Sequence, residues 1–185
     1  AHLKPQLKQG ALHIKQKQCL KKTLQPHQPQ QWVCHFGISS EGKNMNNVVW
    51  TIAGSDSGGG AGIQADIKAM QSFGVHGCTA ITALTAQNSL GVEAINAVST
   101  DIIESQLLAL EKDMKAKVIK IGMLANVQQI QLISEHISHY KAKWPVPPVI
   151  VYDPVAIASS GDLLTEEDTV SAIKECLLPL VDVIT

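Results

Sequence analysis

The stretch Gly54-Ser-Asp-Ser-Gly-Gly-Gly-Ala-Gly62 decides how this chain folds, and five of its nine residues are glycine. An apolar run over residues 48–53 precedes it, and an amphipathic segment over residues 63–73 follows it. A strand that passes through a glycine-rich loop into a helix is typical of a parallel α/β sheet, where the loop presents backbone N–H groups to a ligand. Glycine leaves no Cβ between that backbone and the ligand. The alternative is a tight turn that only packs the helix against the strand.

Two common nucleotide-binding loops match this stretch incompletely. Gly54 and Gly59 have the separation of a Walker A loop, but Gly60-Ala61 stands where Lys-Ser/Thr is required. Residues 60–65 satisfy the dinucleotide fingerprint G-x-G-x-x-A. The acidic residue that should then bind a ribose is missing, because the second predicted strand ends in Thr-Ala-Gln87. A nicotinamide-dependent oxidoreductase is therefore disfavoured.

Asp66 lies on the apolar side of the helix predicted over residues 62–73. At 3.6 residues per turn the apolar stripe comprises Ile63, Ile67, Met70 and Phe73, whereas Gln64, Lys68 and Gln71 face away. An unpaired buried carboxylate is costly. Asp66 therefore either lies at the solvent end of the stripe, where the helix dipole favours it, or faces a cavity and accepts hydrogen bonds from a ligand.

Composition bounds the class of protein. The 185 residues suffice for one domain with a sizeable core, 45% of them are hydrophobic, and the net charge is −1. No apolar run reaches the roughly 18 residues of a membrane span, and nothing suggests nucleic acid as a partner. The four cysteines are widely spaced: Cys19, Cys34, Cys78 and Cys176. We therefore expect free thiols in the cytoplasm and neither a membrane nor a nucleic-acid partner.

Residues 1–44 differ from the rest of the chain. Residues 1–45 contain seven lysines and one acidic residue, whereas residues 46–185 contain eight lysines and fifteen acidic residues. Met45 is the first methionine, and it directly precedes the first predicted strand. We expect residues 1–44 to be an extension that is disordered or not native, and residues 45–185 to form the domain. A basic tail that binds an acidic partner is the alternative.

The domain alternates between strands and helices. Strands are predicted over residues 48–53, 78–85, 118–121, 149–152 and 181–184. Between them, helices are predicted over 62–73, after the capping residues Ser99 and Asn126, and from Thr165 to Pro179. This order predicts an α/β fold with a doubly wound, mostly parallel sheet and helices on both faces. Ligands of such sheets bind beyond the carboxyl ends of the strands.

Unusual residues follow four of these strands. They are the glycine loop, Gln87-Asn88, Gly122-Met123 and Asp153-Pro154-Val155. Gln87 both donates and accepts, which suits a heteroaromatic ring with an amino group beside a ring nitrogen, although an ordinary loop amide is equally compatible. Met123 offers a soft wall for a flat ring, or is a core residue.

Asp153 and the histidines bear on metal binding. An aspartate at a strand end suits a Mg²⁺-phosphate, although Asp153 could simply end its strand. His76, His136 and His139 show no metal-ligand spacing with other donors, so we interpret them as surface residues.

Four segments together resemble the hydroxymethylpyrimidine/phosphomethylpyrimidine kinases of thiamine synthesis. They are residues 52–66, 81–88 and 120–125, and Asp153-Pro-Val155 with Ser160-Gly-Asp162. The resemblance covers about residues 46–185. It implies a ribokinase-like fold, a homodimer, and phosphorylation of 4-amino-5-hydroxymethyl-2-methylpyrimidine and then of its monophosphate with ATP and Mg²⁺. It also implies pyrimidine contacts by Gly54, Asp66, Gln87, Met123 and Val155, with Asp153 near the metal and phosphates.

The resemblance is incomplete at its carboxyl end. The family has an Asn-x-x-Glu motif after its fifth strand and later a Gly-Thr-Gly-Cys motif with the proposed catalytic base, and neither occurs before Thr185. We therefore expect a sheet truncated after about five strands, exposed apolar surface, low stability and no catalytic residue or activity in this chain alone. A pyridoxine/pyridoxal kinase and a non-catalytic pyrimidine-binding remnant are the alternative functions.

Overall fold

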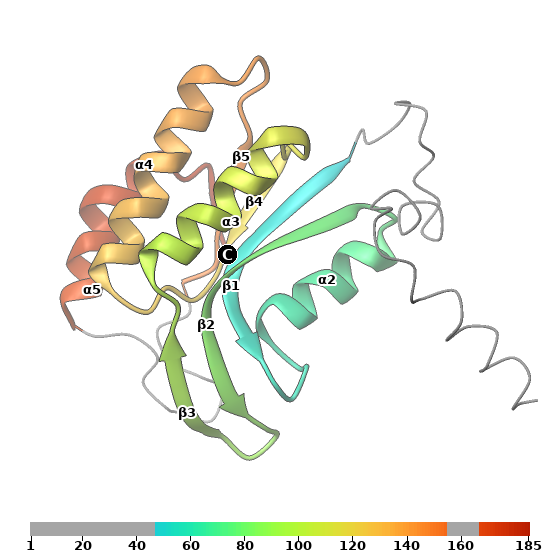
Figure 1. Cartoon of the computed structure of the whole chain (residues 1–185), viewed down its shortest axis with the longest axis vertical. Coiled ribbons are helices and arrows are strands. Elements are labelled where there is room, and N and C mark those ends of the chain that lie inside the picture. Colours follow the sequence, from blue (N-terminus) through green and yellow to red (C-terminus); the bar gives the residue numbers. More distant parts are fainter. Residues whose placement is uncertain (1–46, 155–166) are drawn as a thin grey trace, which may run out of the picture. The chain divides into compact units, whose positions relative to one another are not determined.

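A computed structural model describes residues 47–154 and 167–185 of the chain (Figure 1). Its elements are β1 (Val48–Asp56), α2 (Gly62–Ser72), β2 (His76–Gln87), β3 (Val92–Ala97), α3 (Thr100–Asp113), β4 (Val118–Ile121), α4 (Val127–Lys143), β5 (Val149–Tyr152), α5 (Glu167–Ala172), the π-helical segment η3 (Ile173–Leu177), the 3-10 turn η4 (Leu178–Leu180) and β6 (Val183–Ile184). None of the helices in these two ranges has the length and apolar character needed to cross a bilayer.

The strands form one sheet with the order β3-β2-β1-β4-β5-β6. All neighbouring strands are parallel except β2 and β3, which are antiparallel. The predicted α/β fold with a mostly parallel sheet is therefore confirmed. All five predicted strands are present, and the sheet contains a sixth, the edge strand β3, which was not foreseen.

A hairpin adds β3 to the sheet. In the connection between β2 and β3, the Asn88 N–H donates to the Gly91 carbonyl at 3.1 Å, and the Asn88 Oδ1 accepts from the Leu90 N–H at 2.8 Å. Every residue of β3 except Val92 is exposed. Its sequence, Val-Glu-Ala-Ile-Asn-Ala, also lacks the strict alternation of apolar and polar residues that would reveal a strand.

The pairing of β1 with β2 contains one irregularity. The two strands pair regularly from Val48 opposite His76 to Ala53 opposite Ile81, and pairing resumes with Ser55 opposite Leu84. β2 thus contributes one more residue than β1 over this step, which is the signature of a β-bulge. The bulge lies where β1 enters the glycine loop.

The two faces of the sheet are covered unequally. α3, α4 and α5 cover one face, which we call the three-helix face, and α2 lies on the other, which we call the α2 face (Figure 1). Trp50, Ile119 and Ile150 point to the three-helix face and are fully buried. On the α2 face, the side chain of Val183 in β6 is 46% exposed. This matches the expectation of exposed apolar surface on the last predicted strand.

Aromatic residues fill one end of the three-helix face. The Trp50 ring makes edge-on contacts with the rings of Tyr140 and Trp144, with centroids 5.7 and 5.5 Å apart. The Trp50 Nε1–H donates to the Met114 carbonyl at 2.7 Å, so its polar atom is paired although the residue is buried. Burial, followed by the nearby Glu111 carboxylate, raises the pKa of the Tyr140 hydroxyl well above its usual range.

Helix ends account for several departures from the predictions. α2 ends at Ser72, and Phe73 is 83% exposed, so its placement in the apolar stripe was wrong. The chain turns there, with Gly74 at a φ of 68°. Asn126 caps α4 as predicted, because its side chain accepts from the Gln129 N–H at 3.0 Å. Ser99 is the N-cap of α3, but its side chain forms no capping hydrogen bond.

The carboxyl-terminal elements also differ in detail. The predicted helix start at Thr165 lies outside the described residues, and the helix is described from Glu167 onward as α5. It continues through η3 and η4 and includes Pro179 in its last turn instead of ending before it. The predicted strand over residues 181–184 is shortened to Val183–Ile184.

Candidate functional site

The glycine loop is closed around its own aspartate. The Asp56 carboxylate accepts hydrogen bonds from the N–H groups of Gly58 at 2.7 Å and of Gly60 and Ala61 at 2.8 Å. Burial opposes ionisation of this carboxyl, but the N–H groups of Ala61, Gly58, Gly60 and Gly59 outweigh it and lower the pKa of Asp56 below its usual range. These N–H groups therefore point to Asp56, and the prediction that the loop presents its N–H groups to a ligand was wrong for Gly58, Gly60 and Ala61.

The start of α2 lies directly against the end of β1. A Cβ on Gly62 would lie 2.3 Å from the Gly54 carbonyl oxygen, and Gly62 has a φ of 55°, so only glycine fits there. A Cβ on Gly54 would lie 3.3 Å from the Met123 Sδ. The structure thus brings together Gly54 and Met123, two of the predicted pyrimidine contacts.

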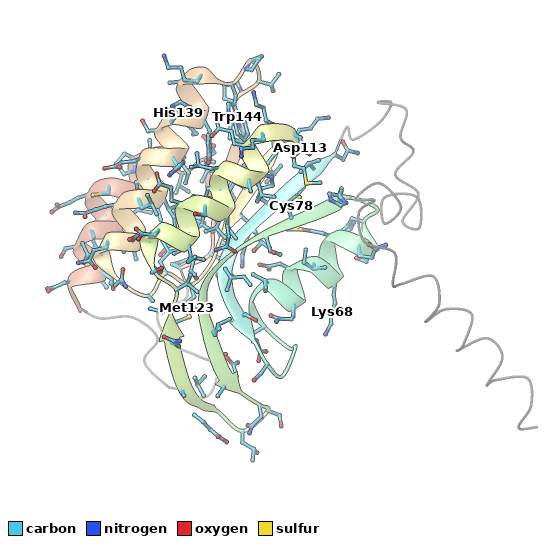
Figure 2. All side chains as sticks on the ribbon, in the orientation of Figure 1. Lys68, Cys78, Asp113, Met123, His139 and Trp144 are labelled. Carbon is cyan, nitrogen blue, oxygen red and sulfur yellow. The ribbon has the colours of Figure 1, made fainter. Side chains whose placement is uncertain are left out.

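Two polar side chains of α2 fasten the loop. The Gln64 Oε1 accepts from the Asp56 N–H at 2.9 Å, and its Nε2 donates to the Ser55 Oγ at 2.8 Å. The prediction that Gln64 faces away from the fold was therefore wrong. Lys68 projects from α2 (Figure 2), and its Nζ donates to the Gly59 carbonyl at 2.6 Å.

Ser57 joins the glycine loop to the end of β2. Its Oγ donates to the Gln87 carbonyl at 2.7 Å and accepts from the Gln87 N–H at 2.8 Å. The hydroxyl thus satisfies both backbone groups of a predicted pyrimidine contact. The Gln87 side chain accepts from the Thr85 Oγ1 at 3.3 Å, and no hydrogen bond within residues 47–154 and 167–185 joins it to Asp66.

Asp66 is paired on the α2 face. Its Oδ2 accepts from the Thr51 Oγ1 at 2.5 Å and lies 3.2 Å from the Lys120 Nζ. The same Nζ lies 3.3 Å from the Asp153 Oδ2. The side chains of Asp66 and Lys120 are 18% and 21% exposed, whereas that of Asp153 is 41% exposed. Asp66 is therefore not at the solvent end of its helix, and one lysine connects it to the predicted metal-side carboxylate.

Lys120 was not predicted as a site residue, although the sequence contains a signal for it. It stands between Ile119 and Ile121 in a four-residue strand, where a charged side chain needs a partner. Gly122 leaves room for its ammonium group, because a Cβ there would lie 3.0 Å from the Nζ.

Gln129 is a second residue that the sequence did not reveal. It is fully buried, and its Oε1 accepts from the Ala125 N–H at 2.9 Å. Its Nε2 donates to the carbonyls of Thr82 at 2.9 Å and Val98 at 2.8 Å. Gln129 therefore fixes the loop that follows β4 and carries Met123.

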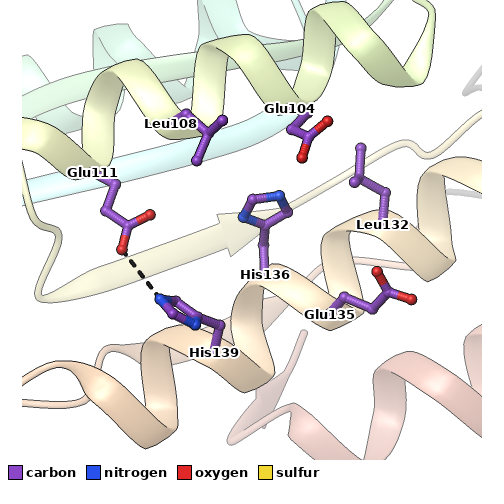
Figure 3. A pocket seen from close by; sticks show the side chains of 7 residues that line it. All are labelled: Glu104, Leu108, Glu111, Leu132, Glu135, His136 and His139. Atoms are coloured by element: carbon purple, nitrogen blue, oxygen red, sulfur yellow. Dashed lines mark ion pairs between the residues drawn. The ribbon is translucent and has the colours of Figure 1, made fainter.

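The remaining predicted residues lie elsewhere. Val155 and the segment 160–162 fall outside the described residues. His136 and His139 line a groove of about 260 Å³ between α3 and α4 (Figure 3). In it the His139 Nε2 lies 3.4 Å from the Glu111 Oε1. The groove contains none of the predicted site residues, and the part of the chain that the structure describes holds no group of three potential metal ligands.

The family model for phosphomethylpyrimidine kinase matches residues 56–185, a range that includes Asp66, Gln87, Met123 and Asp153. The chain belongs to the phosphomethylpyrimidine kinase family. The hydroxymethylpyrimidine/phosphomethylpyrimidine kinase of Haemophilus influenzae is 49% identical over 143 residues, which are 76% of this chain and 51% of that protein. The chain thus spans about half the length of the curated relatives it matches.

Solved structures show the same fold. The phosphomethylpyrimidine kinase of Clostridium difficile 630 is 39% identical, with a TM-score of 0.68 over 75% of this chain and 58% of that one. The pyridoxal kinase of Bacillus subtilis, solved as an ADP complex, is 34% identical, with a TM-score of 0.63 over 75% of this chain and 51% of that one. The ribokinase-like fold of the family is therefore confirmed.

Proposed function

We propose that this chain forms the pyrimidine-binding part of a kinase that phosphorylates 4-amino-5-hydroxymethyl-2-methylpyrimidine and then its monophosphate. The observation that carries the proposal is the Lys120 bridge between Asp66 and Asp153, in a chain of this family. It joins a carboxylate beneath the glycine loop to one at the carboxyl end of a neighbouring strand. Phosphoryl transfer depends mainly on such positioning of charges.

Asp66, Gln87 and Met123 are the proposed readers of the ring. The hydrogen bonds to Asp66 from Thr51 and Lys120 both end on Oδ2. This leaves Oδ1 to accept from the amino group of an aminopyrimidine. Met123, whose Sδ lies in the space that a Cβ on Gly54 would approach, would form an apolar wall for the ring, and the Gln87 amide would pair with the polar edge of the ring.

ATP is the proposed phosphoryl donor and Mg²⁺ its counter-ion. Asp153 would hold Mg²⁺, since it follows β5 at the carboxyl edge of the sheet and its carboxylate is only partly exposed. Bound Mg²⁺ would neutralise charge on the phosphates. The N–H groups of the glycine loop do not suit the ATP phosphates, because they already bind Asp56. Gly54 and Val155 remain proposed pyrimidine contacts.

Calorimetric titration of the pyrimidine alcohol into the 185-residue chain tests the proposal. We expect saturable binding, and we expect Asp66→Asn to weaken it about tenfold or more, equivalent to about 1.4 kcal/mol. Asp101→Asn, an exposed position in the first turn of α3, is the matched control and should bind like the wild type. No binding by the wild-type chain, or equal binding by Asp66→Asn, would contradict the proposal.

A pyridoxal kinase is the second candidate, favoured by the structural likeness to that enzyme. Competition decides between the two, because both ligands are flat heteroaromatic alcohols that would occupy one pocket. If pyridoxal displaces the pyrimidine at lower concentration than the reverse, the chain belongs to a pyridoxal kinase.

We also infer that the protein acts in the cytoplasm and as a homodimer. Among the described residues Cys78 and Cys176 are both unpaired thiols, as expected in a reducing compartment. Fractionation of the native cells and light scattering of the purified protein test the two inferences.

A further inference from the structure

We propose that Asp56 is an internal anion that fills the glycine loop and excludes phosphate from it. The loop would thus be set to receive the uncharged part of the substrate. Asp56 would be a positioning residue that acts on the pyrimidine site through its neighbours. The link to substrate binding rests on the proposed function, whereas the filled loop itself does not.

The geometry is that of an occupied anion nest. Gly58 donates to Oδ1, whereas Gly60 and Ala61 donate to Oδ2, all within 2.8 Å. A fourth group, the Gly59 N–H, donates to the Asp56 backbone carbonyl at 3.1 Å. Successive N–H groups that converge on one point form a concave site for a negative charge. Here that charge comes from the protein, and Asp56 is 5% exposed.

The filled loop has a consequence for which ligand it accepts. The positive end of α2 lies beside it, since that helix begins at Gly62. In many nucleotide-binding proteins a substrate phosphate occupies this position. With Asp56 in place a second anion would meet like charge and find no free donor among the Gly58, Gly60 and Ala61 N–H groups. The phosphate of a monophosphate substrate would therefore lie away from the loop.

The same loop carries the contacts of the proposed pyrimidine site. Ser57, the next residue in the chain, forms hydrogen bonds with both backbone groups of Gln87. The Asp56 N–H donates to the Gln64 Oε1, and the loop returns so closely that a Cβ on Gly62 would clash with the Gly54 carbonyl oxygen. Loss of the Asp56 carboxylate would leave the N–H groups without a partner and would loosen Gly54 and Gln87 together.

Anion rescue of Asp56→Ala tests the proposal. We expect its melting temperature to fall by about 5 °C, because charge-assisted hydrogen bonds to three N–H groups are lost. Sodium formate at about 0.1 M should recover a large part of that loss, and sodium chloride at equal ionic strength should not, because both salts screen charges equally. Formate should also restore pyrimidine affinity to the variant. Asp101→Ala, an exposed aspartate in the first turn of α3, is the matched control and should respond equally to both salts.

Inorganic phosphate supplies a second readout. We expect it to stabilise Asp56→Ala more than the wild-type chain, because only the variant has an open nest. Equal responses to formate and chloride, an unchanged melting temperature of Asp56→Ala, or stronger phosphate stabilisation of the wild type would overturn the proposal. If the wild-type chain binds no pyrimidine, the proposed function fails, while the salt responses still decide the role of Asp56.

A second variant covers the case in which Asp56→Ala folds in neither salt. Asp56→Asn keeps the size of the side chain and one acceptor, but its amide nitrogen cannot accept from N–H groups. We expect a folded protein with about tenfold weaker pyrimidine binding, which formate does not restore because the amide occupies the nest. Wild-type affinity in Asp56→Asn would refute the positioning role.

Discussion

The two faces of the sheet contrast sharply, although the same strands supply both. On β1, Trp50 packs into the aromatic cluster of the three-helix face, whereas the next residue, Thr51, donates to Asp66 on the α2 face. On β4, Ile119 is fully buried on the three-helix face, whereas Lys120 bridges two carboxylates on the α2 face. Alternation along each strand thus separates the apolar core from the candidate chemistry.

This contrast predicts which property a substitution on each face should change. Truncation on the three-helix face removes packed apolar surface and should reduce the free energy of unfolding. Substitution on the α2 face changes a partly exposed charge cluster and should affect ligand binding more than stability.

Trp50→Ala should destabilise the core on the three-helix face. The indole is fully buried, contacts Tyr140 and Trp144, and donates to the Met114 carbonyl. We expect a loss of about 3–5 kcal/mol in the free energy of unfolding, measured by urea denaturation. Phe73→Ala is the matched control, because its 83% exposed ring should change stability by no more than about 0.5 kcal/mol. Similar losses in the two variants would contradict the assignment of the core.

Gln129→Ala should show that a polar residue on the three-helix side also supports the site. Its removal leaves the Ala125 N–H and the carbonyls of Thr82 and Val98 without this partner. We expect a loss of about 2–3 kcal/mol in urea denaturation, together with weaker pyrimidine binding because the Met123 loop loosens. The neighbouring Gln128 is exposed, so Gln128→Ala should change neither property.

Lys120→Met, on the α2 face, should affect ligand binding more than stability. The variant keeps the aliphatic part of the side chain but removes the charge that holds Asp66 and Asp153. We expect pyrimidine affinity to fall about tenfold, whereas the free energy of unfolding changes by only about 1–2 kcal/mol because the pair is partly exposed. Lys117→Met, at an exposed lysine beside the start of β4, should bind normally. A large loss of stability with unchanged affinity would assign Lys120 to the fold alone.

Asp182→Asn should produce the smallest effect, and this effect should disappear in acid. A hydrogen bond from Lys141, followed by one from the Ile150 N–H, lowers the pKa of Asp182. A lowered folded-state pKa stabilises the protein above the unfolded value of about 3.9, and this contribution disappears as the pH falls through the folded-state pKa. Near neutral pH the variant should therefore be less stable than the wild type by about 1 kcal/mol or less. As the pH falls below about 4, the variant should lose less of its free energy of unfolding than the wild type loses. Asp168→Asn, on the exposed side of α5, is the matched control and should be as stable as the wild type near neutral pH.

The strands of the core could be predicted because their composition is unambiguous. The predicted bounds of residues 118–121 and 149–152 coincide with β4 and β5. Both are short runs rich in β-branched residues that fully bury alternate side chains. β3 has no buried face, and Phe73 was placed by helical periodicity one residue beyond the point where the helix ends. Local patterns therefore predict what is buried better than where an element ends.

The candidate site could be predicted only in part. Helical periodicity placed Asp66 on the buried side of α2, and the structure confirms that position. Its partner Lys120 lies 54 residues away in sequence and reaches it only because β1 and β4 pair with Thr51 beside Lys120. The role of Asp56 depends on the path of a loop whose glycines allow many conformations. Partners set by strand register and loop path leave little trace in a single sequence.

The bulge between β1 and β2 shifts the pairing register by one residue and so determines which face of the sheet the last residues of β2 occupy. If β2 kept all its residues but paired without a bulge, Ser55 would lie opposite Ala83 instead of Leu84, and every later side chain of β2 would change faces. Gln87 would then share a face with Thr79. With the bulge, Gln87 lies instead on the same face as Thr85, the residue that pairs with Asp56. Deletion of one residue at positions 82–83 would remove the bulge but leave Ser55 opposite Leu84, so Ala86 and Gln87 would keep their faces. The Gln87 amide, proposed to contact the pyrimidine, therefore owes its orientation to the β-bulge. The bulge precedes it by more than about ten ångströms along the strand, at roughly 3.3 Å per residue.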